Sequence, residues 1–345
     1  MRSHLRRCAA SVPLTLVVCA ASGAVPKAQQ AATSSSASAW TAPRTSDGRP
    51  DLQGVWTNAT LTPLERPVHL ADRRFLTEAE AKALEAQAAG RQASADEPQA
   101  RQQALARGDI GSYNQFWFDS GTTILPTRQT SLVVDPPDGR VPLRPEAEAR
   151  RDAALARSTD DPEFMSMWDR CISRGVPGWV IPAGYNNAYQ IVQTKDFVVI
   201  HSEMIHDARI IPLDGRPPVP ATVRLLEGDS RGRWEGDTLV VETTNFGDRN
   251  WIATSAASGR IKGIPQSPSL RIVERFTRVA PDRIDYEARI EDPEIFTRPW
   301  TLAFPLMRDD EYRIYEYACH EGNQAVEGVL RGARYQERTP ERPRQ

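Results

Sequence analysis

The second half of the chain consists of short runs in which apolar and polar residues alternate, the pattern of half-buried β-strands. Polar turns, most of them two to five residues long, separate these runs. Open sheet edges invite pairing with other chains, so a meander of this length is expected to close into a barrel. After about residue 185 the eight predicted strands are "YQIVQT", "FVVIHSEM", "ARIIPLD", "TLVVETTNF", "LRIVERFTRV", "DRIDYEARIED", "WTLAFPLM" and "YRIYEYACHE".

Segments with the sequence pattern of helices precede the predicted strands. The segment "TEAEAKALEAQAAGRQASADEPQARQQALAR" opens with Thr77 and Glu80 at the spacing of a capping box and predicts helices broken around Gly90 and Pro98. A second helix is predicted in "PEAEARRDAALARS", which begins with a proline at a favourable first-turn position, and a short third one in "DPEFMSMWDRCI". The predicted fold is therefore mainly β, with an N-terminal helical insertion at about 75–172 within one barrel domain that spans 49–345.

The N-terminus has the features of an export signal. Three arginines, an apolar run and small residues near Ala24 predict a signal peptide over 1–24, and the run is too short and too weakly apolar for a transmembrane helix. A lipoprotein with Cys19 as the lipidated residue is the alternative. The Ala/Ser/Gln-rich residues 25–48 predict a disordered leader. We therefore expect a secreted or periplasmic protein without a membrane span.

Two cysteines remain in the mature chain, Cys171 and Cys319. Thiols exported to an oxidising compartment usually pair, so a disulfide is expected; two unpaired buried thiols are the alternative. Closing a 148-residue loop would add on the order of 4 kcal/mol of stability in the chain-entropy model.

Charge and motifs exclude several function classes. Removing the three signal arginines from the 43 basic residues leaves 40 against 45 acidic ones, a net charge of about −5, and no basic patch stands out. Nucleic acid is therefore not an expected partner. The chain has no G-x-S-x-G elbow, no P-loop and no G-x-G-x-x-G phosphate loop, so no nucleotide or other cofactor is expected.

The stretch "FVVIHSEMIHDARIIPL" concentrates polar residues within strand-like text. Strict alternation from Phe197 places His201, Glu203, Asp207 and Arg209 on one face and the more apolar set with His206 on the other, unless a bulge near Ile205 changes the order. His201, Glu203 and His206 are possible metal ligands for a hydrolase. Histidines five apart on an undistorted strand point to opposite faces, however, so no metal is predicted.

Acid–base chemistry is the preferred use of these residues. Histidine titrates near neutral pH, and a neighbouring carboxylate raises its basicity. The predicted catalytic residues are His206, His320, Asp207, Glu203 and Arg209, with arginine holding developing negative charge. The predicted substrate-binding residues are Tyr185, Asn186, Asn187, His201, Tyr113, Asn114, Trp117, Glu316 and Asn323. A plain turn is the alternative for the asparagines, and a cover over the barrel mouth is the alternative for the aromatic residues near 113–118.

Two resemblances add context. "DLQGVWTN" places Gly54 and Trp56 in a G-x-W pattern that resembles the first strand of lipocalin-like barrels, and that likeness implies an arginine over the tryptophan, with Arg331 or Arg334 as candidates. About 120 mostly helical residues after this strand depart from the lipocalin pattern. The chain also resembles a large uncharacterised family of secreted soil-bacterial proteins, which implies a location and no activity. The matching segments are "PDLQGVW", "LTPLERP", "YNQFWFD", "TSLVVDPPDGR", "YNNAYQIVQT", "EMIHDARIIPLDGRP", "GDSRGRWEGDTLVVETTNF", "ERFTRV" and "YEYACHEGN".

Three functions are compatible with these patterns. The preferred hypothesis is a secreted, cofactor-free lyase, isomerase or hydrolase acting on a small organic molecule or glycan fragment. The first alternative is a lipocalin-like carrier of a hydrophobic or aromatic molecule, and the second is the metal-dependent hydrolase. An enzyme requires His206 or His320 beside a carboxylate in the same cavity as Arg209, whereas a carrier requires an apolar lumen with the histidines outside it.

Overall fold

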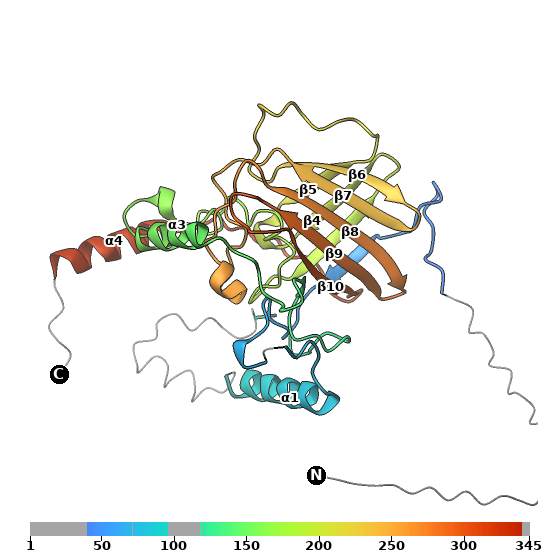
Figure 1. The fold of residues 1–345 in the computed structure, drawn as a ribbon, viewed down its shortest axis with the longest axis horizontal. Coiled ribbons are helices and arrows are strands. Elements are labelled where there is room, and N and C mark those ends of the chain that lie inside the picture. Colours follow the sequence, from blue (N-terminus) through green and yellow to red (C-terminus); the bar gives the residue numbers. More distant parts are fainter. Residues whose placement is uncertain (1–39, 71, 96–117, 120, 340–345) are drawn as a thin grey trace, which may run out of the picture. The chain divides into compact units, whose positions relative to one another are not determined.

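The computed structural model describes residues 40–70, 72–95, 118–119 and 121–339, and these contain a nearly closed antiparallel β-barrel with a few helices (Figure 1). The predicted mainly β fold is thereby confirmed. The predicted signal peptide and most of the predicted leader fall outside the described residues. The strands are β1 (Gly54–Thr57), β2 (Val133–Asp135), β3 (Ala188–Gln193), β4 (Phe197–Ser202), β5 (Ala208–Pro212), β6 (Asp229–Glu235), β7 (Thr238–Thr244), β8 (Arg271–Ala280), β9 (Arg283–Glu291) and β10 (Trp300–Arg308).

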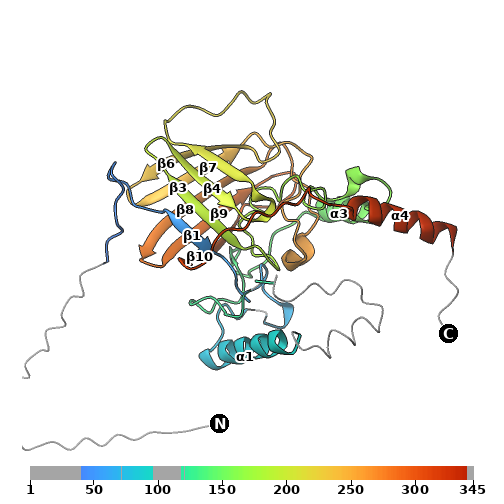
Figure 2. The same ribbon diagram turned by 180° about the vertical axis from the view of Figure 1, so that it is seen from behind.

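The barrel consists of two meanders joined by the first strand. Within the described chain the order is β5-β4-β3-β1-β10-β9-β8-β7-β6, and β2 pairs with β10 outside this path. Figure 2 shows β1 between β3 and β10. The expected uninterrupted meander is therefore wrong in this detail. The G-x-W segment supplies the missing strand, and β6 forms in a segment for which no strand was predicted.

One seam of the barrel has no ladder hydrogen bonds. Nine strands paired antiparallel along one path leave its two ends, β5 and β6, running in the same direction. Side chains close this seam instead: Arg209 donates to Ser230 at 2.9 Å, and Ile211 packs against Gly232. A Cβ at Gly232 would lie 2.8 Å from Ile211 Cγ2, so only glycine allows this close approach.

The barrel interior is filled by side chains. Phe276, Tyr286 and Phe304 stack in sequence at centroid distances of 4.9 and 5.1 Å within one continuous hydrophobic core. Among them lies a buried ion pair, in which Arg209 donates to both carboxylate oxygens of Glu274. The core therefore occupies the space in which a lipocalin-type carrier would hold its ligand.

The ion pair has further hydrogen-bond partners. Arg209 also donates to Thr243 Oγ1 at 2.6 Å, and Tyr286 donates its hydroxyl to Glu274 Oε1 at 3.0 Å. Burial raises the pKa of Tyr286 well above its ordinary value, and the Glu274 carboxylate adds to the shift, so the hydroxyl keeps its proton. A buried charge requires this degree of satisfaction, since an unpaired one is costly in a low dielectric.

Trp56 lies fully inside the barrel, where its indole Nε1 donates to Leu52 O at 2.9 Å. The guanidinium carbons of Arg278 and Arg308 lie 5.5 and 5.6 Å from its ring centroid. The lipocalin-like arrangement of tryptophan and arginine is thus present, but the assignment to Arg331 or Arg334 is wrong. Those two residues lie on a C-terminal helix that the alternation pattern did not predict.

The observed helices match the predicted ones in part. α1 (Glu78–Ala95) starts with the predicted capping box, in which Thr77 and Glu80 bond each other's backbone N–H, but it continues through Gly90 without a break. α3 (Pro145–Ala156) confirms the second helix, and only a single 3₁₀ turn, η3 (Pro162–Phe164), forms in the third. α4 (Ala325–Arg338) ends the described chain. None of the described helices is long and apolar enough to cross a membrane.

The segment after β10 corrects another strand prediction. Residues 309–324, here called the connector, contain the alternating run "YRIYEYACHE" but form no strand. The expected disulfide is confirmed: Cys171 and Cys319 are bonded, with Cα atoms 5.5 Å apart, and anchor the connector. Glu316, Ala318 and His320 consequently do not share a strand face.

Candidate functional site

A pocket of about 530 Å³ lies where the connector meets the segment that follows η3 and the segment that precedes β3. Three separate parts of the chain form it, and the Cys171–Cys319 disulfide joins two of them. Four of the residues predicted from the sequence to bind substrate are in its wall. The lining residues are Trp168, Asp169, Cys171, Tyr185, Asn186, Tyr315, Glu316, Tyr317, Ala318, Cys319, Asn323 and Ala325.

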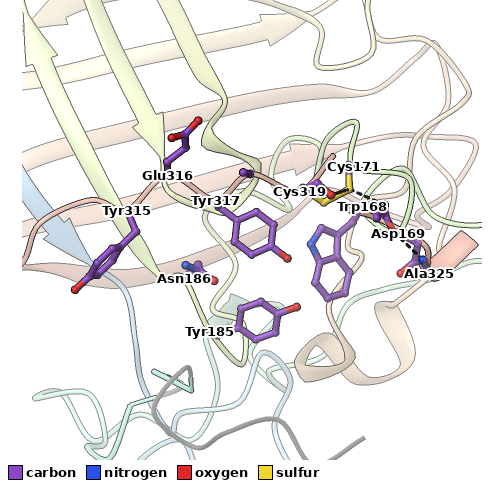
Figure 3. Close-up of a pocket in the computed structure, with 12 residues that line it drawn as sticks. Trp168, Asp169, Cys171, Tyr185, Asn186, Tyr315, Glu316, Tyr317, Cys319 and Ala325 are labelled. Atoms are coloured by element: carbon purple, nitrogen blue, oxygen red, sulfur yellow. Dashed lines mark hydrogen bonds between the residues drawn. A yellow bond between two sulfur atoms is a disulfide. The ribbon is translucent and has the colours of Figure 1, made fainter. Parts of the chain in front are cut away.

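Aromatic rings dominate one side of this pocket. The ring of Tyr185 lies 6.1 Å from that of Trp168 and 6.4 Å from that of Tyr317, centroid to centroid. Figure 3 shows these three side chains gathered together, whereas the carboxylate of Glu316 points away from them. The ring of Phe118 meets that of Tyr185 edge-on, with a distance of 6.1 Å between the centroids. Such a group of rings offers stacking surface to a flat ligand.

A strained turn lies next to the pocket, where Glu203 and His206 contact the pocket residues Asn186 and Tyr317. Between β4 and β5 the backbone adopts φ of +64° at Ile205 and +44° at His206, and Ser202 N donates to Asp207 O at 2.9 Å across the turn. A β-branched residue rarely adopts this conformation, which costs of the order of 1–3 kcal/mol. The turn replaces the continuous strand on which the predicted alternation depended. Arg209 therefore lies on the inner face of β5, and this position does not suit the catalytic role predicted for it.

Glu203 anchors this turn to the connector. It is 0% exposed, and its carboxylate accepts hydrogen bonds from Asn186 Nδ2, from the Tyr312 hydroxyl at 2.9 Å and from Tyr315 N at 3.1 Å. Burial, followed by the hydrogen bond to Glu203, raises the pKa of Tyr312, so this hydroxyl remains a donor. These contacts attach the connector to the barrel and explain how the carboxylate is buried without a salt bridge to any described residue.

The two asparagines have different environments. Asn186 is half-buried and lines the pocket, whereas Asn187 is 0% exposed and its side chain bonds Asp119 and both backbone groups of Ala183. Burial raises the pKa of Asp119, although its bonds from Asn187 act in the opposite direction. Asn187 thus holds the entry to β3 in place and does not face the pocket. Tyr113, Asn114 and Trp117 lie outside the described residues.

The histidines do not assemble as predicted. His206 is exposed, and its Nδ1 lies 2.9 Å from Tyr317 O. Since a carbonyl only accepts, Nδ1 must carry a proton, which leaves Nε2 as the basic nitrogen in neutral histidine. His320 is exposed in the connector, and no carboxylate of the described chain forms a salt bridge with either histidine. Within the described residues neither histidine is thus paired with a carboxylate, and the predicted His/carboxylate chemistry stays a prediction.

The metal hypothesis meets a similar difficulty. Within the described ranges no three His, Cys, Asp or Glu residues are grouped so as to hold a metal ion. His201 is paired opposite Gln190 and Ala208 in the sheet, Glu203 turns toward Tyr312, and His206 contacts the connector. The strained turn directs the three side chains to different places, so they do not meet at one point.

One carboxylic acid near the turn was not identified from the sequence. Glu227 is half-buried and accepts hydrogen bonds from Ser173 Oγ and, at 2.7 Å, from Trp179 Nε1. Burial raises the pKa of Glu227, and the negative charge of Asp207 adds to the shift. Glu227 lies just before β6 in a polar stretch of the sequence, and this pattern did not predict that its side chain is partly buried.

The raised pKa of Glu227 predicts a dependence of stability on pH. The folded protein holds the carboxyl proton of Glu227 more tightly than the unfolded chain does. The resulting contribution to the free energy of unfolding is present at acidic pH and is lost as the pH rises through the pKa of the folded state. At pH 7 the isosteric variant Glu227→Gln should therefore melt at a higher temperature than the wild type, and the difference should vanish near pH 4. Thermal unfolding followed by circular dichroism measures this. Glu316→Gln, which alters an exposed carboxylate, is the control, and a Glu227→Gln variant with a lower melting temperature at pH 7 would contradict the assignment.

Comparisons with protein-family models, curated proteins and solved structures returned no match. The resemblance to secreted soil-bacterial proteins stays a prediction. The function must therefore be argued from the pocket.

Proposed function

We propose that this protein is exported and binds a small organic molecule that carries a ring, in the aromatic pocket beside the connector. The observation that carries the proposal is the grouping of Trp168, Tyr185 and Tyr317 around a pocket of about 530 Å³. Rings of this kind bind planar aromatic molecules or the apolar face of a sugar by stacking.

Two further features support this location. The barrel interior is packed with the core and the Arg209–Glu274 pair, so a ligand in the lumen would displace side chains that are fully buried. The disulfide also fixes two segments of the pocket wall relative to each other, which lowers the entropy lost on binding. Export is supported by the same disulfide and by the N-terminal sequence pattern.

The site is tested with two ring compounds, benzoate and benzyl alcohol, by ligand-observed NMR on the mature protein. Replacement of Tyr185 by leucine should weaken binding of both compounds about five-fold or more, since an aromatic contact contributes about 0.5–1.5 kcal/mol beyond its buried area. Tyr335→Leu is the matched control, because Tyr335 is 68% exposed on α4, and should leave both affinities unchanged. Equal loss in both variants, or no binding of either compound by the wild type, would refute the proposal.

Acid–base catalysis at the same pocket is the second candidate. It is favoured by His206, whose Nδ1 contact with Tyr317 O leaves Nε2 as a base next to a pocket residue. A lyase, isomerase or hydrolase would alter its bound compound, and His206→Gln would prevent the change while binding persists. A compound recovered unaltered after incubation with the wild type supports the binding function.

A further inference from the structure

A second pocket, of about 680 Å³, has no part in the proposed function. It shares the segment 167–172 with the aromatic pocket. Trp168, Asp169 and Cys171 line the aromatic pocket, and Met167, Arg170 and Ile172 line the second one. Because their described lining residues do not overlap, the two pockets are separate sites that share one wall.

Three arginines, Arg170, Arg224 and Arg249, line this second pocket, here called the arginine pocket. They come from three segments far apart in the chain, so they form no basic cluster in the sequence. Arg224 and Arg249 are exposed, and a ligand in solvent can reach both. Arg224 Nη1 donates to Pro268 O at 3.0 Å, and since a guanidinium carries five N–H donors, others remain for a ligand.

Two acidic residues, Glu163 and Asp248, also line the arginine pocket. Both are exposed, so water and salt screen their charges. Three arginines against two carboxylates still leave this wall positive, in a chain that has more acidic than basic residues. The charge of the wall therefore favours an anion.

Apolar side chains lie beside the arginines. Ile172, Leu225 and Leu226 line the pocket and are 40%, 41% and 36% exposed, and Trp251 adds a ring. Apolar side chains gathered in a hollow and surrounded by polar groups are a common feature of ligand sites. The combination fits a molecule that has an apolar body and a negatively charged end.

The loops of the arginine pocket are fixed by hydrogen bonds. Gln266 is 3% exposed, and its Nε2 donates to Leu226 O at 3.2 Å and to Gly247 O at 2.8 Å. Leu225 N donates to Asn245 O at 2.9 Å, and Gly247 N donates to Leu225 O at 2.8 Å. Since these bonds hold two parts of the wall together without a ligand, little conformational entropy is lost on binding.

We propose that the arginine pocket binds an apolar organic carboxylate. Its aliphatic part lies against Ile172, Leu225 and Leu226, and its carboxylate pairs with Arg224 and Arg249. The planar guanidinium forms two parallel hydrogen bonds with a carboxylate, which an ammonium group cannot do. This site differs from the aromatic pocket in its walls and in its ligand, so the inference does not depend on the proposed function.

Octanoate and octan-1-ol test this inference, because they share an aliphatic chain and differ in the carboxylate. In isothermal titration calorimetry the mature wild type should bind octanoate at least about ten-fold more tightly, as expected for charge-assisted hydrogen bonds. The double variant Arg224→Gln/Arg249→Gln should lower the octanoate affinity to that of octan-1-ol and leave the octan-1-ol affinity unchanged. Leu226→Ser should weaken both probes, because it removes apolar surface from the wall.

The matched control is Arg331→Gln/Arg338→Gln, which removes two arginines from exposed positions on α4 and changes the net charge equally. It should change neither affinity. Equal wild-type affinities for the two probes, or no binding of octanoate, would overturn the inference. Equal losses of octanoate affinity in the two double variants would identify a general effect of net charge and also overturn it. The same holds if Tyr185→Leu abolishes octanoate binding and Arg224→Gln/Arg249→Gln does not, since octanoate would then occupy the aromatic pocket.

Discussion

Replacement of Glu274 by leucine should lower the free energy of unfolding by about 3–5 kcal/mol, the usual effect of leaving a buried charge without its partner. Arg209 would lose both of its bonds to the carboxylate and would keep only the hydroxyls of Ser230 and Thr243. Urea denaturation at pH 7, followed by circular dichroism, measures the change.

The double variant Arg209→Met/Glu274→Leu is the matched control. It removes both charges and should regain most of the stability lost in Glu274→Leu, because well-packed apolar residues often replace a buried ion pair at little cost. If Glu274→Leu lowered the free energy of unfolding by less than about 1 kcal/mol, the ion pair could not lie inside the barrel core.

Removal of the disulfide should have an effect of similar size. The double variant Cys171→Ser/Cys319→Ser frees a loop with a sequence separation of 148 residues and should lose about 4 kcal/mol. It should also bind benzyl alcohol more weakly, since both cysteines line the pocket. Reductant should destabilise the wild type to the same extent and leave the double variant unchanged. An unaltered denaturation midpoint in reduced wild type would contradict this role of the disulfide.

Alternation and cysteine count were sufficient for the barrel and for its covalent link. Seven of the eight predicted strand segments correspond to β3, β4, β5, β7, β8, β9 and β10. The eighth, in the connector, has the right alternation but no partner strand, because β1 already occupies the edge of β10. A pattern of side chains specifies which faces are apolar; it does not specify which strand edge is available.

The site was less accessible to sequence reasoning, for two physical reasons. The turn at Ile205 and His206 has positive φ angles, and neither residue is a glycine, which would have indicated such a turn in the sequence. This turn changes the face of the sheet on which Arg209 lies. Trp168 and Tyr317 belong to segments far apart in the chain, so their proximity to Tyr185 depends on the disulfide and the connector. Tyr185 and Asn186 were selected as binding residues, and both line the pocket.

The lipocalin-like pattern shows the same limit. Trp56 was correctly singled out, yet its arginines are Arg278 and Arg308, near the ends of β8 and β10.

The most direct test of a ligand site at the connector is a crystal structure of the mature protein soaked with benzoate. We expect the ring to lie against Trp168, Tyr185 and Tyr317, with the Arg209–Glu274 pair intact in the barrel. Benzoate bound inside the barrel in place of core side chains, with the aromatic pocket empty, would contradict the account.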